Sequence, residues 1–286
     1  MSSKYKNYLG LGIAGNFALH LAQAGELEDF KDVITADEAA PKGIFPFYLP
    51  FYTTSTHTTT RVPKKILTIY PLSSDTLQLP KADVNIQIEP EVVLVCEICY
   101  TDDKVESITP THFAAYNDCS IRVSGAEKIS DKKNWGANSK GISPTLIPID
   151  KFKESGVMDN YSICSFLKRD NLLTPYGENV MLNGYNYFYS KLTKWIKNQI
   201  NTQENFGPLE PLSEYIDACN YPSKMLISIG ATRYTEYGET TFLKENDEIF
   251  VVVYKHKIYS FEDIIATIND NEYLKKGMSI LHQKVI

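Results

Sequence analysis

The chain has 286 residues, of which 43% are apolar and 22% are charged, and its formal net charge is -6. This composition is typical of a globular protein with a substantial core, and an acidic chain without a stripe of Lys and Arg is a poor candidate for binding nucleic acid or an anionic membrane. No apolar run reaches the roughly 18–20 residues of a membrane-spanning helix. Because the first residues carry no secretory pattern and the five cysteines are scattered and odd in number, we expect a cytoplasmic protein without a disulfide framework.

The first predicted elements are a strand and a helix. Residues 8–15, YLGLGIAG, predict a strand, and FALHLAQAGELEDF, which follows Gly15-Asn16, is typical of a helix. The threonine-rich segment 51–60 fits either a strand or a mobile flap, and we place a possible flap around residues 45–65.

Residues 86–100 predict a strand with two further features. Pro90 indicates an edge position or a bulge, because proline cannot donate a hydrogen bond to a neighbouring strand. Cys96 and Cys99 form a single CxxC pair, whereas a zinc site would need a second pair that the sequence lacks. We therefore interpret both as buried free thiols.

The second half adds a helix, a strand and a last helix. Asn183-Gly184 predicts a hairpin turn, and residues 248–254, EIFVVVY, predict the clearest strand. Ser260 and Asp263 resemble a capping box that opens the last helix. A further helix is predicted between the Asn183-Gly184 turn and the strand over 248–254. Apolar residues at helical spacing lie on one of its faces, namely Phe188, Leu192, Trp195, Ile196 and Ile200. Strands dominate, so we predict an α+β fold whose strands fold back on themselves.

Three carboxylates stand out as candidate metal ligands. Glu89 and Glu91 lie at i and i+2, so in a strand their side chains point to the same face. Asp118 follows the apolar stretch FAAY. Three carboxylates without a Cys or His partner suit a hard cation, and Mg²⁺ or Mn²⁺ fits best. From spacing alone, solvated surface acids remain the alternative.

Five segments, in one order from about residue 8 to 254, resemble the fumarylacetoacetate hydrolase superfamily. They are GIAGNFALHLAQ, IEPEVVLV, AAYNDCSIR, SKGISPTLIPID and ISIGATRYTEYGETTFLKENDEIFVVV. The residues that match its motifs are Asn16, His20, Glu89, Glu91, Asp118, Arg122, Lys140, Thr232, Gly238, Leu243, Lys244 and Asp247. The resemblance implies a mixed β-sandwich roll with few helices, one domain over residues 1–286 with a longer insertion around 150–225, and a homodimer.

The resemblance also implies roles for the charged residues. Glu89, Glu91 and Asp118 would hold Mg²⁺ or Mn²⁺. Lys140 would lie near the ion and take a substrate carboxylate or stabilise an enolate oxygen, although an exposed lysine is the ordinary alternative. Arg122 would bind a substrate carboxylate through two hydrogen bonds or brace Asp118.

Three further residues are candidates for catalysis and substrate binding. His20 is the candidate general base, with a packed helix histidine as the alternative, and Thr232 and Asn16 are candidates for substrate binding. In several members of the superfamily a glutamate three residues after the histidine orients it. Here that position is Gln23, and Glu26 is too far along a helix to replace it simply.

The predicted function is a divalent-metal-dependent enzyme acting on a small dioxo- or oxo-carboxylic acid through a metal-stabilised enolate, by hydrolysis of a carbon–carbon bond, decarboxylation or tautomerisation. The substitution at Gln23 leaves a second hypothesis open, a catalytically degenerate relative that binds a small ligand or a protein partner without turnover. A structural or interaction protein is a third.

Overall fold

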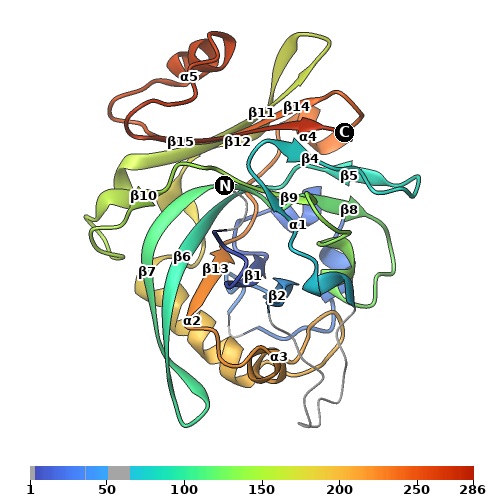
Figure 1. Ribbon diagram of the computed structural model, residues 1–286, viewed down its shortest axis with the longest axis vertical. Coiled ribbons are helices and arrows are strands. Elements are labelled where there is room, and N and C mark those ends of the chain that lie inside the picture. The colour runs from blue at the N-terminus through green and yellow to red at the C-terminus, as the bar shows by residue number, and fades with distance from the viewer. Residues whose placement is uncertain (1–3, 36, 51–64) are drawn as a thin grey trace.

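The computed structural model describes residues 4–35, 37–50 and 65–286 (Figure 1). Within these residues the chain forms two large mixed sheets, one small sheet and five α-helices, which confirms the predicted α+β class with few helices. None of the helices in these ranges is long and apolar enough to cross a membrane.

The eight-stranded sheet has the order β2-β1-β13-β6-β7-β9-β3, with β10 paired to β7. Its strands are β1 (Leu9–Ala14), β2 (Gly43–Tyr48), β3 (Leu72–Ser73), β6 (Pro90–Thr101), β7 (Lys104–Asn117), β9 (Lys140–Ile142), β10 (Ile147–Pro148) and β13 (Lys224–Ser228).

The five-stranded sheet has the order β12-β11-β14-β15-β4, and β5 pairs with β8 in the small sheet. These strands are β4 (Thr76–Leu77), β5 (Asn85–Gln87), β8 (Ser120–Arg122), β11 (Tyr161–Arg169), β12 (Leu172–Met181), β14 (Glu248–Lys255) and β15 (Met278–Val285).

The helices are short apart from the one predicted from its apolar face. The α-helices are α1 (His20–Gln23), α2 (Tyr189–Thr202), α3 (Leu212–Ala218), α4 (Glu236–Thr240) and α5 (Phe261–Asn269). The 3₁₀ helices are η1 (Leu27–Phe30), η2 (Lys65–Thr68), η3 (Ile129–Lys132), η4 (Val157–Asn160) and η5 (Leu182–Gly184).

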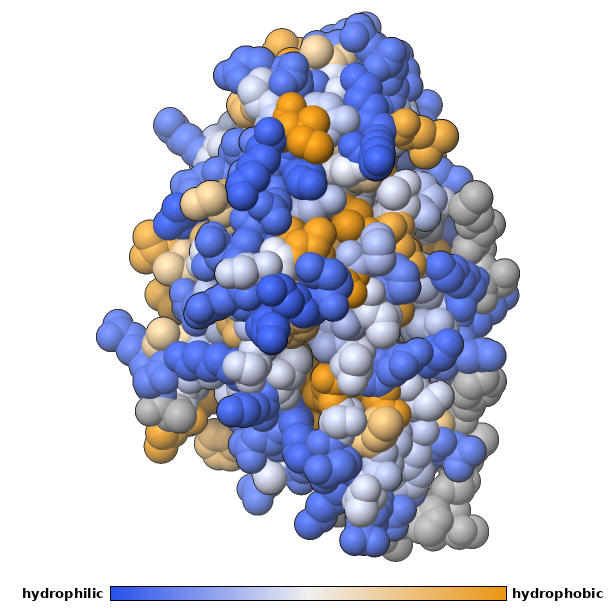
Figure 2. All heavy atoms as spheres, turned by 90° about the vertical axis from the view of Figure 1, so that its left-hand side faces the viewer, coloured by the Kyte–Doolittle hydropathy of each residue, from blue (hydrophilic) through white to orange (hydrophobic). Residues whose placement is uncertain are grey.

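The largest apolar cluster joins the two large sheets and α2. Leu94 of β6, Val251 of β14 and Leu192 of α2 all belong to it and are fully buried. Val93, which points the other way along β6, belongs to a second cluster with Phe45 of β2 on the opposite face of the eight-stranded sheet. One side of the surface is mostly hydrophilic, with apolar atoms in small separate groups (Figure 2).

Several sequence predictions are confirmed. The strand over 248–254 is β14, and Ser260 and Asp263 form the predicted capping box of α5. The helix with the apolar face is α2, in which Leu192, Ile196 and Ile200 are buried. The predicted insertion at 150–225 contains β11, β12, α2 and α3, so part of it belongs to the five-stranded sheet.

Other predictions are wrong in detail. Pro90 begins β6 inside the sheet, where its missing N–H has no cost, and the irregularities in the β6–β7 pairing come later along the strand. Asn183-Gly184 closes the 3₁₀ turn η5 before α2 instead of a hairpin. Cys96 is buried as predicted, but Cys99 is exposed because it points to the other face near the strand end.

The predicted flap and N-terminal helix also differ from expectation. Residues 45–48 of the predicted flap form part of β2, and 51–64 lie outside the described residues. The N-terminal helix has only four α-helical residues, since α1 ends at Gln23 and Gly25 takes a φ of 69°. A positive φ is accessible to glycine without strain, and here it reverses the chain after one helical turn.

Candidate metal centre

The pairing of β6, β7 and β9 brings the acids together. Pro90 lies opposite Asn117, and Gly141 lies opposite Asn117 on its other side. One residue further on, Asp118 therefore lies between Glu89 and Lys140, and its N–H donates to the carbonyl of Glu89 at 3.0 Å. Residues two apart share a face of a sheet, so Glu91 points the same way as Glu89.

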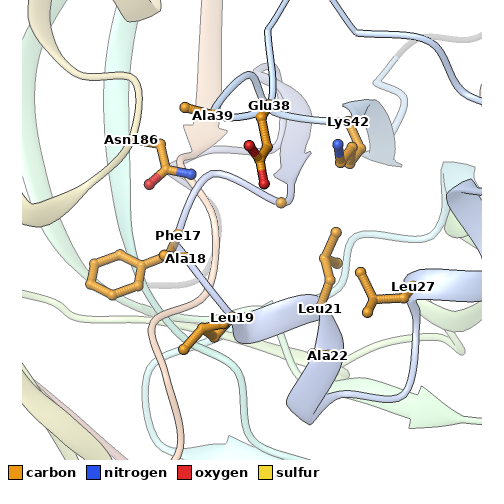
Figure 3. Close-up of a pocket in the computed structure, with 11 residues that line it drawn as sticks. Phe17, Ala18, Leu19, Leu21, Ala22, Leu27, Glu38, Ala39, Lys42 and Asn186 are labelled. Carbon is orange, nitrogen blue, oxygen red and sulfur yellow. The ribbon is translucent and has the colours of Figure 1, made fainter.

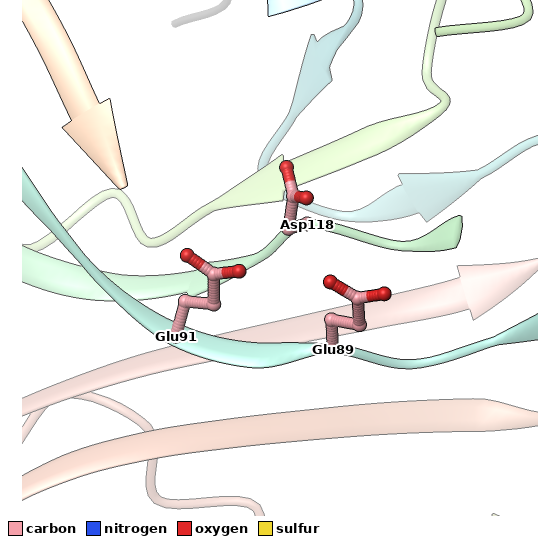
Figure 4. A group of neighbouring side chains, drawn as sticks. All are labelled: Glu89, Glu91 and Asp118. Carbon is pink, nitrogen blue, oxygen red and sulfur yellow. The ribbon is translucent and has the colours of Figure 1, made fainter. Parts of the chain in front are cut away.

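The three carboxylates converge as the Glu-x-Glu spacing predicted. One oxygen from each of Glu89, Glu91 and Asp118 lies within 4.8 Å of the others, and all three residues are buried. Figure 4 shows Glu89 and Glu91 on one segment, at the start of β6, and Asp118 on the neighbouring segment, just after β7. This is the only such group of three among the residues that the structure describes.

Lys140 is in direct contact with one of these acids. Its Nζ donates to the Asp118 backbone carbonyl and to Asp118 Oδ1, both at 2.7 Å, and Lys140 is fully buried. A lysine with no exposed surface is rare unless it is paired, so the sequence default of an exposed lysine is wrong here. The ion pair fixes one oxygen of Asp118.

Lys133 is a cation that the sequence analysis missed. It follows η3, and its Nζ lies 2.5 Å from Glu89 Oε2 and 2.7 Å from Asp118 Oδ2. Only 3% of its side chain is exposed. No motif marks this position, and lysine is usually a surface residue, so its burial could not be read from the sequence.

Arg122 extends the network away from the acids. Its Nη1 lies 2.9 Å from both Glu89 Oε1 and Glu26 Oε1, and its Nη2 donates to the Tyr234 hydroxyl at 2.8 Å. Its Nε donates to Gln87 Oε1 at 2.6 Å. The sequence analysis considered two roles for Arg122, binding a substrate carboxylate and bracing Asp118. In the structure Arg122 braces an acid, but that acid is Glu89 and not Asp118.

Glu26 reaches the site despite its distance along the sequence. Because α1 ends after one turn, the chain folds back, and the Glu26 N–H donates to the Leu21 carbonyl at 2.9 Å. Its carboxylate contacts Arg122 at 2.9 Å and Lys132 at 2.8 Å. Glu26 therefore joins the charged network through Arg122 and Lys132, whereas no hydrogen bond between Glu26 and His20 is found among the described residues, so the expectation that Glu26 does not replace the orienting glutamate stands.

His20 is buried, and its environment favours the neutral imidazole. Burial lowers its pKa from 6.5 to about 4, against the opposing effect of the nearby Glu89 carboxylate. Its ring lies 5.1 Å from the ring of Tyr234, measured between centroids. Within the described residues its Nδ1 has no hydrogen-bond partner. The ring is therefore neutral near pH 7 and its Nδ1 is open to a proton donor, while the lowered pKa makes it a weaker base than an exposed histidine.

Asn16 and Thr232 hold backbone segments in place. Asn16 Nδ2 donates to the carbonyls of Tyr187 and Ile229 at 3.0 and 2.9 Å, and its Oδ1 accepts from the Tyr187 N–H at 2.8 Å. Thr232 donates its N–H to the Pro90 carbonyl at 3.1 Å, and its hydroxyl lies 3.4 Å from the same oxygen. Both polar side chains therefore position the loops around the acids.

The pKa values of Glu89 and Glu91 are shifted in opposite directions. Burial, with the adjacent carboxylates of Asp118 and Glu89, raises the pKa of Glu91 well above its usual value. Burial would also raise the pKa of Glu89, but the cations of Lys133 and Arg122 outweigh it and hold that pKa well below its usual range. Glu91 is thus the carboxylate whose negative charge is least compensated by protein cations.

The donors fit a hard divalent cation in kind and number. Mg²⁺ and Mn²⁺ prefer carboxylate oxygens, and a cation among Glu89, Glu91 and Asp118 would relieve the repulsion that raises the Glu91 pKa. Lys133 is the one group of the cluster that contacts two of these acids at once and so competes with an ion.

A hollow of about 400 Å³ adjoins the network, with the charged side chains of Glu26, Arg122 and Lys132 in its lining. Arg122 also contacts Glu89. Arg122 therefore separates this hollow from the three carboxylates: it lines the hollow on one side and contacts Glu89 on the other.

A second hollow, of about 470 Å³, lies against α1 (Figure 3). Glu38 and Lys42 face Leu21 and Leu27 across it. Its described lining includes none of the predicted site residues, so it is separate from the acid cluster.

One protein family matches most of the sequence. The model of a family described as a family of unknown function, DUF5718, matches residues 26–285. No curated protein matches the chain.

Solved structures share the fold over nearly the whole chain. Cg1458 with an inhibitor is 16% identical, with a TM-score of 0.54 and coverage of 97% of this chain and 76% of that one. A 2-keto-3-deoxyarabinonate dehydratase is 10% identical, with a TM-score of 0.53 and coverage of 97% and 73%. A 2-keto-3-deoxy-D-arabinonate dehydratase complexed with magnesium and 2,5-dioxopentanoate is 12% identical, with a TM-score of 0.52 and coverage of 97% and 72%. These matches show that the chain has the same fold as these proteins over nearly its whole length.

Proposed function

We propose that this protein, which belongs to the family of unknown function DUF5718, is a divalent-metal-dependent enzyme acting on a small oxo- or dioxo-carboxylic acid. One observation carries the proposal: the buried carboxylates of Glu89, Glu91 and Asp118 converge within 4.8 Å. A solved structure of the same fold was complexed with magnesium and 2,5-dioxopentanoate, which supports this class of ion and ligand.

In this proposal Glu89, Glu91 and Asp118 hold Mg²⁺ or Mn²⁺. The bound ion would supply Lewis-acid stabilisation of negative charge on the substrate oxygens. Lys140 fixes Asp118 through two hydrogen bonds at 2.7 Å and adds a positive charge beside the site. The small-molecule acid is the proposed partner, and the protein is proposed to act as a homodimer.

Arg122 and His20 have the remaining roles. Arg122 lines the 400 Å³ hollow and contacts Glu89, and in this proposal it keeps Glu89 in position and offers its remaining Nη2 hydrogen to the carboxylate of an incoming acid. His20, whose pKa is lowered to about 4 mainly by burial, is neutral near pH 7 and can take a proton from water or from a substrate carbon. Hydrolysis and tautomerisation would use this base, whereas decarboxylation would not need it at the bond-breaking step.

Turnover of simple oxo acids tests the proposal. The protein, freed of metal with EDTA, would be assayed with oxaloacetate and acylpyruvates before and after addition of Mg²⁺ or Mn²⁺. We expect activity only with the ion, and a loss of at least about 100-fold in His20→Asn if a general base is used. Absence of turnover with every acid and ion would contradict the enzyme proposal.

A second candidate is binding of a small acid without turnover. The observation that favours it is that protein cations already compensate Glu89 and Asp118, so the buried cluster is stable without an ion. Binding of oxalate together with Mn²⁺, without turnover of any acid, would support this candidate over the enzyme.

A further inference from the structure

The ammonium of Lys133 lies between two of the candidate metal ligands, Glu89 and Asp118, in the position that a metal ion bound to both would occupy. It is 2.5 Å from Glu89 Oε2 and 2.7 Å from Asp118 Oδ2. The other oxygens of these acids are also bound, Glu89 Oε1 by Arg122 at 2.9 Å and Asp118 Oδ1 by Lys140 at 2.7 Å. Both oxygens of each carboxylate are therefore taken by protein cations.

The segment that carries Lys133 is anchored in this position. The next residue, Asn134, donates its side-chain N–H groups to the carbonyls of Phe47 and Ile69 at 2.9 and 3.1 Å. The Lys133 Nζ also lies 5.1 Å from the centre of the Phe45 ring. These contacts direct the side chain inward from the end of η3.

Lys133 has fewer hydrogen bonds to other protein groups than Arg122 and Lys140, the other two cations of the cluster. Arg122 is also bound to Gln87 and Tyr234, and Lys140 is also bound to the Asp118 backbone carbonyl. Within the described residues, the Lys133 ammonium donates a hydrogen bond to Glu89 Oε2 and forms an ion pair with Asp118 Oδ2, and it has no further hydrogen-bond partner. It is the cation that can leave without breaking further hydrogen bonds.

We propose that Lys133 is a built-in cation that fills the metal position in the metal-free protein and must vacate it when a divalent ion binds. This inference rests on the proposed function, because it concerns the same three acids. Mg²⁺ and Mn²⁺ bind carboxylate oxygens at about 2.0–2.1 Å, so the ion and the ammonium cannot share the same two oxygens. Departure of this one side chain frees an oxygen of Glu89 and an oxygen of Asp118 together.

Exchange of one cation for another explains how a buried acid cluster can remain folded without metal. Three carboxylates in a closed site repel one another unless a positive charge lies among them. Lys133 would supply that charge before the ion arrives, at the cost of weaker ion binding.

The test compares Mn²⁺ binding by the wild type and by Lys133→Met, whose unbranched side chain lacks the ammonium and is one atom shorter. Lys132→Met is the matched control, since Lys132 is equally buried but pairs with Glu26 and Asp29. We expect Lys133→Met to bind Mn²⁺ at least about tenfold more tightly, or about 1.4 kcal/mol, and Lys132→Met to stay within about threefold of the wild type.

A second measurement uses the wild type alone and does not depend on the folding of a variant. Reductive methylation followed by mass spectrometry would report whether the Lys133 amine is accessible. We expect Lys133 to be protected without metal and to become modified at Mn²⁺ concentrations that saturate the site.

The outcomes separate this inference from the proposed function. Equal or weaker Mn²⁺ binding by Lys133→Met, or unchanged labelling in saturated wild type, would overturn the exchange while metal-dependent turnover could stand. Binding by Lys133→Met with neither binding nor turnover by the wild type would support the built-in cation and contradict the enzyme proposal. No Mn²⁺ binding by any of the three proteins would overturn both.

Discussion

Gln23 holds the backbone of Tyr234 by both ends of its side-chain amide. Its Nε2 donates to the Tyr234 carbonyl at 3.1 Å, and its Oε1 accepts from the Tyr234 N–H at 2.9 Å. The Tyr234 hydroxyl in turn donates to the Ile88 carbonyl and accepts from Arg122, both at 2.8 Å. Gln23 therefore supports Arg122 through Tyr234 and is not free to orient His20.

This arrangement predicts that Gln23→Glu destabilises the protein and does not restore a His-Glu pair. A carboxylate cannot donate to the Tyr234 carbonyl, so we expect a loss of about 1–3 kcal/mol in the free energy of unfolding, measured with urea. Gln199→Glu, on α2, is the control and should change stability by less than about 0.5 kcal/mol. Wild-type stability together with faster hydrolysis of an acylpyruvate would argue for a dyad instead.

Glu26 is predicted to be important for stability although it lies outside the recognised motifs. Glu26→Gln removes the charge that faces Arg122 and Lys132 in a buried setting, and breaking such a pair costs about 3–5 kcal/mol. Glu28→Gln is the control, because the Glu28–Lys31 pair is exposed and of little value. Equal unfolding midpoints for the two variants would refute the importance of the buried network.

His20 is predicted to make stability fall in mild acid. Its pKa is about 4 in the folded protein, mainly through burial, whereas the ordinary pKa of histidine is 6.5. Below pH 6.5 the unfolded chain therefore binds a proton at His20, whereas the folded chain does not. The free energy of unfolding falls as the pH is lowered from 6.5 to 4, by about 3 kcal/mol in total. In His20→Asn this loss should be absent, which urea unfolding at pH 7, 6, 5 and 4 would show. Parallel pH profiles for the two proteins would contradict the buried neutral histidine.

The acid cluster could be predicted from the sequence because its geometry follows from strand periodicity. Glu89 and Glu91 share a face at a spacing of two, and the register that places Asp118 opposite Glu89 follows from adjacent strands that turn back on each other. The family resemblance supplied Lys140 and Arg122. In the structure Lys140 contacts Asp118 and Arg122 contacts Glu89.

Lys133 and Glu26 were missed for physical reasons. Glu26 reaches the site only because α1 ends after one turn, before Gly25, a helix-stop signal that the apolar pattern of the segment outweighed. Lys133 is buried because η3 is anchored by a tertiary contact of Asn134 with β2. Propensity and periodicity describe local structure, whereas both placements depend on contacts between distant segments.

The most direct test of the central claim is a calorimetric titration of Mn²⁺, with oxalate present, into the wild type, Asp118→Asn and Asp247→Asn. Asp247 is a buried aspartate that pairs with Arg169, so its variant controls for loss of a buried charge outside the site. We predict binding to the wild type and to Asp247→Asn, and at least about 100-fold weaker binding to Asp118→Asn. Equal binding by the wild type and Asp118→Asn, or no binding to the wild type, would contradict a metal site at these three carboxylates.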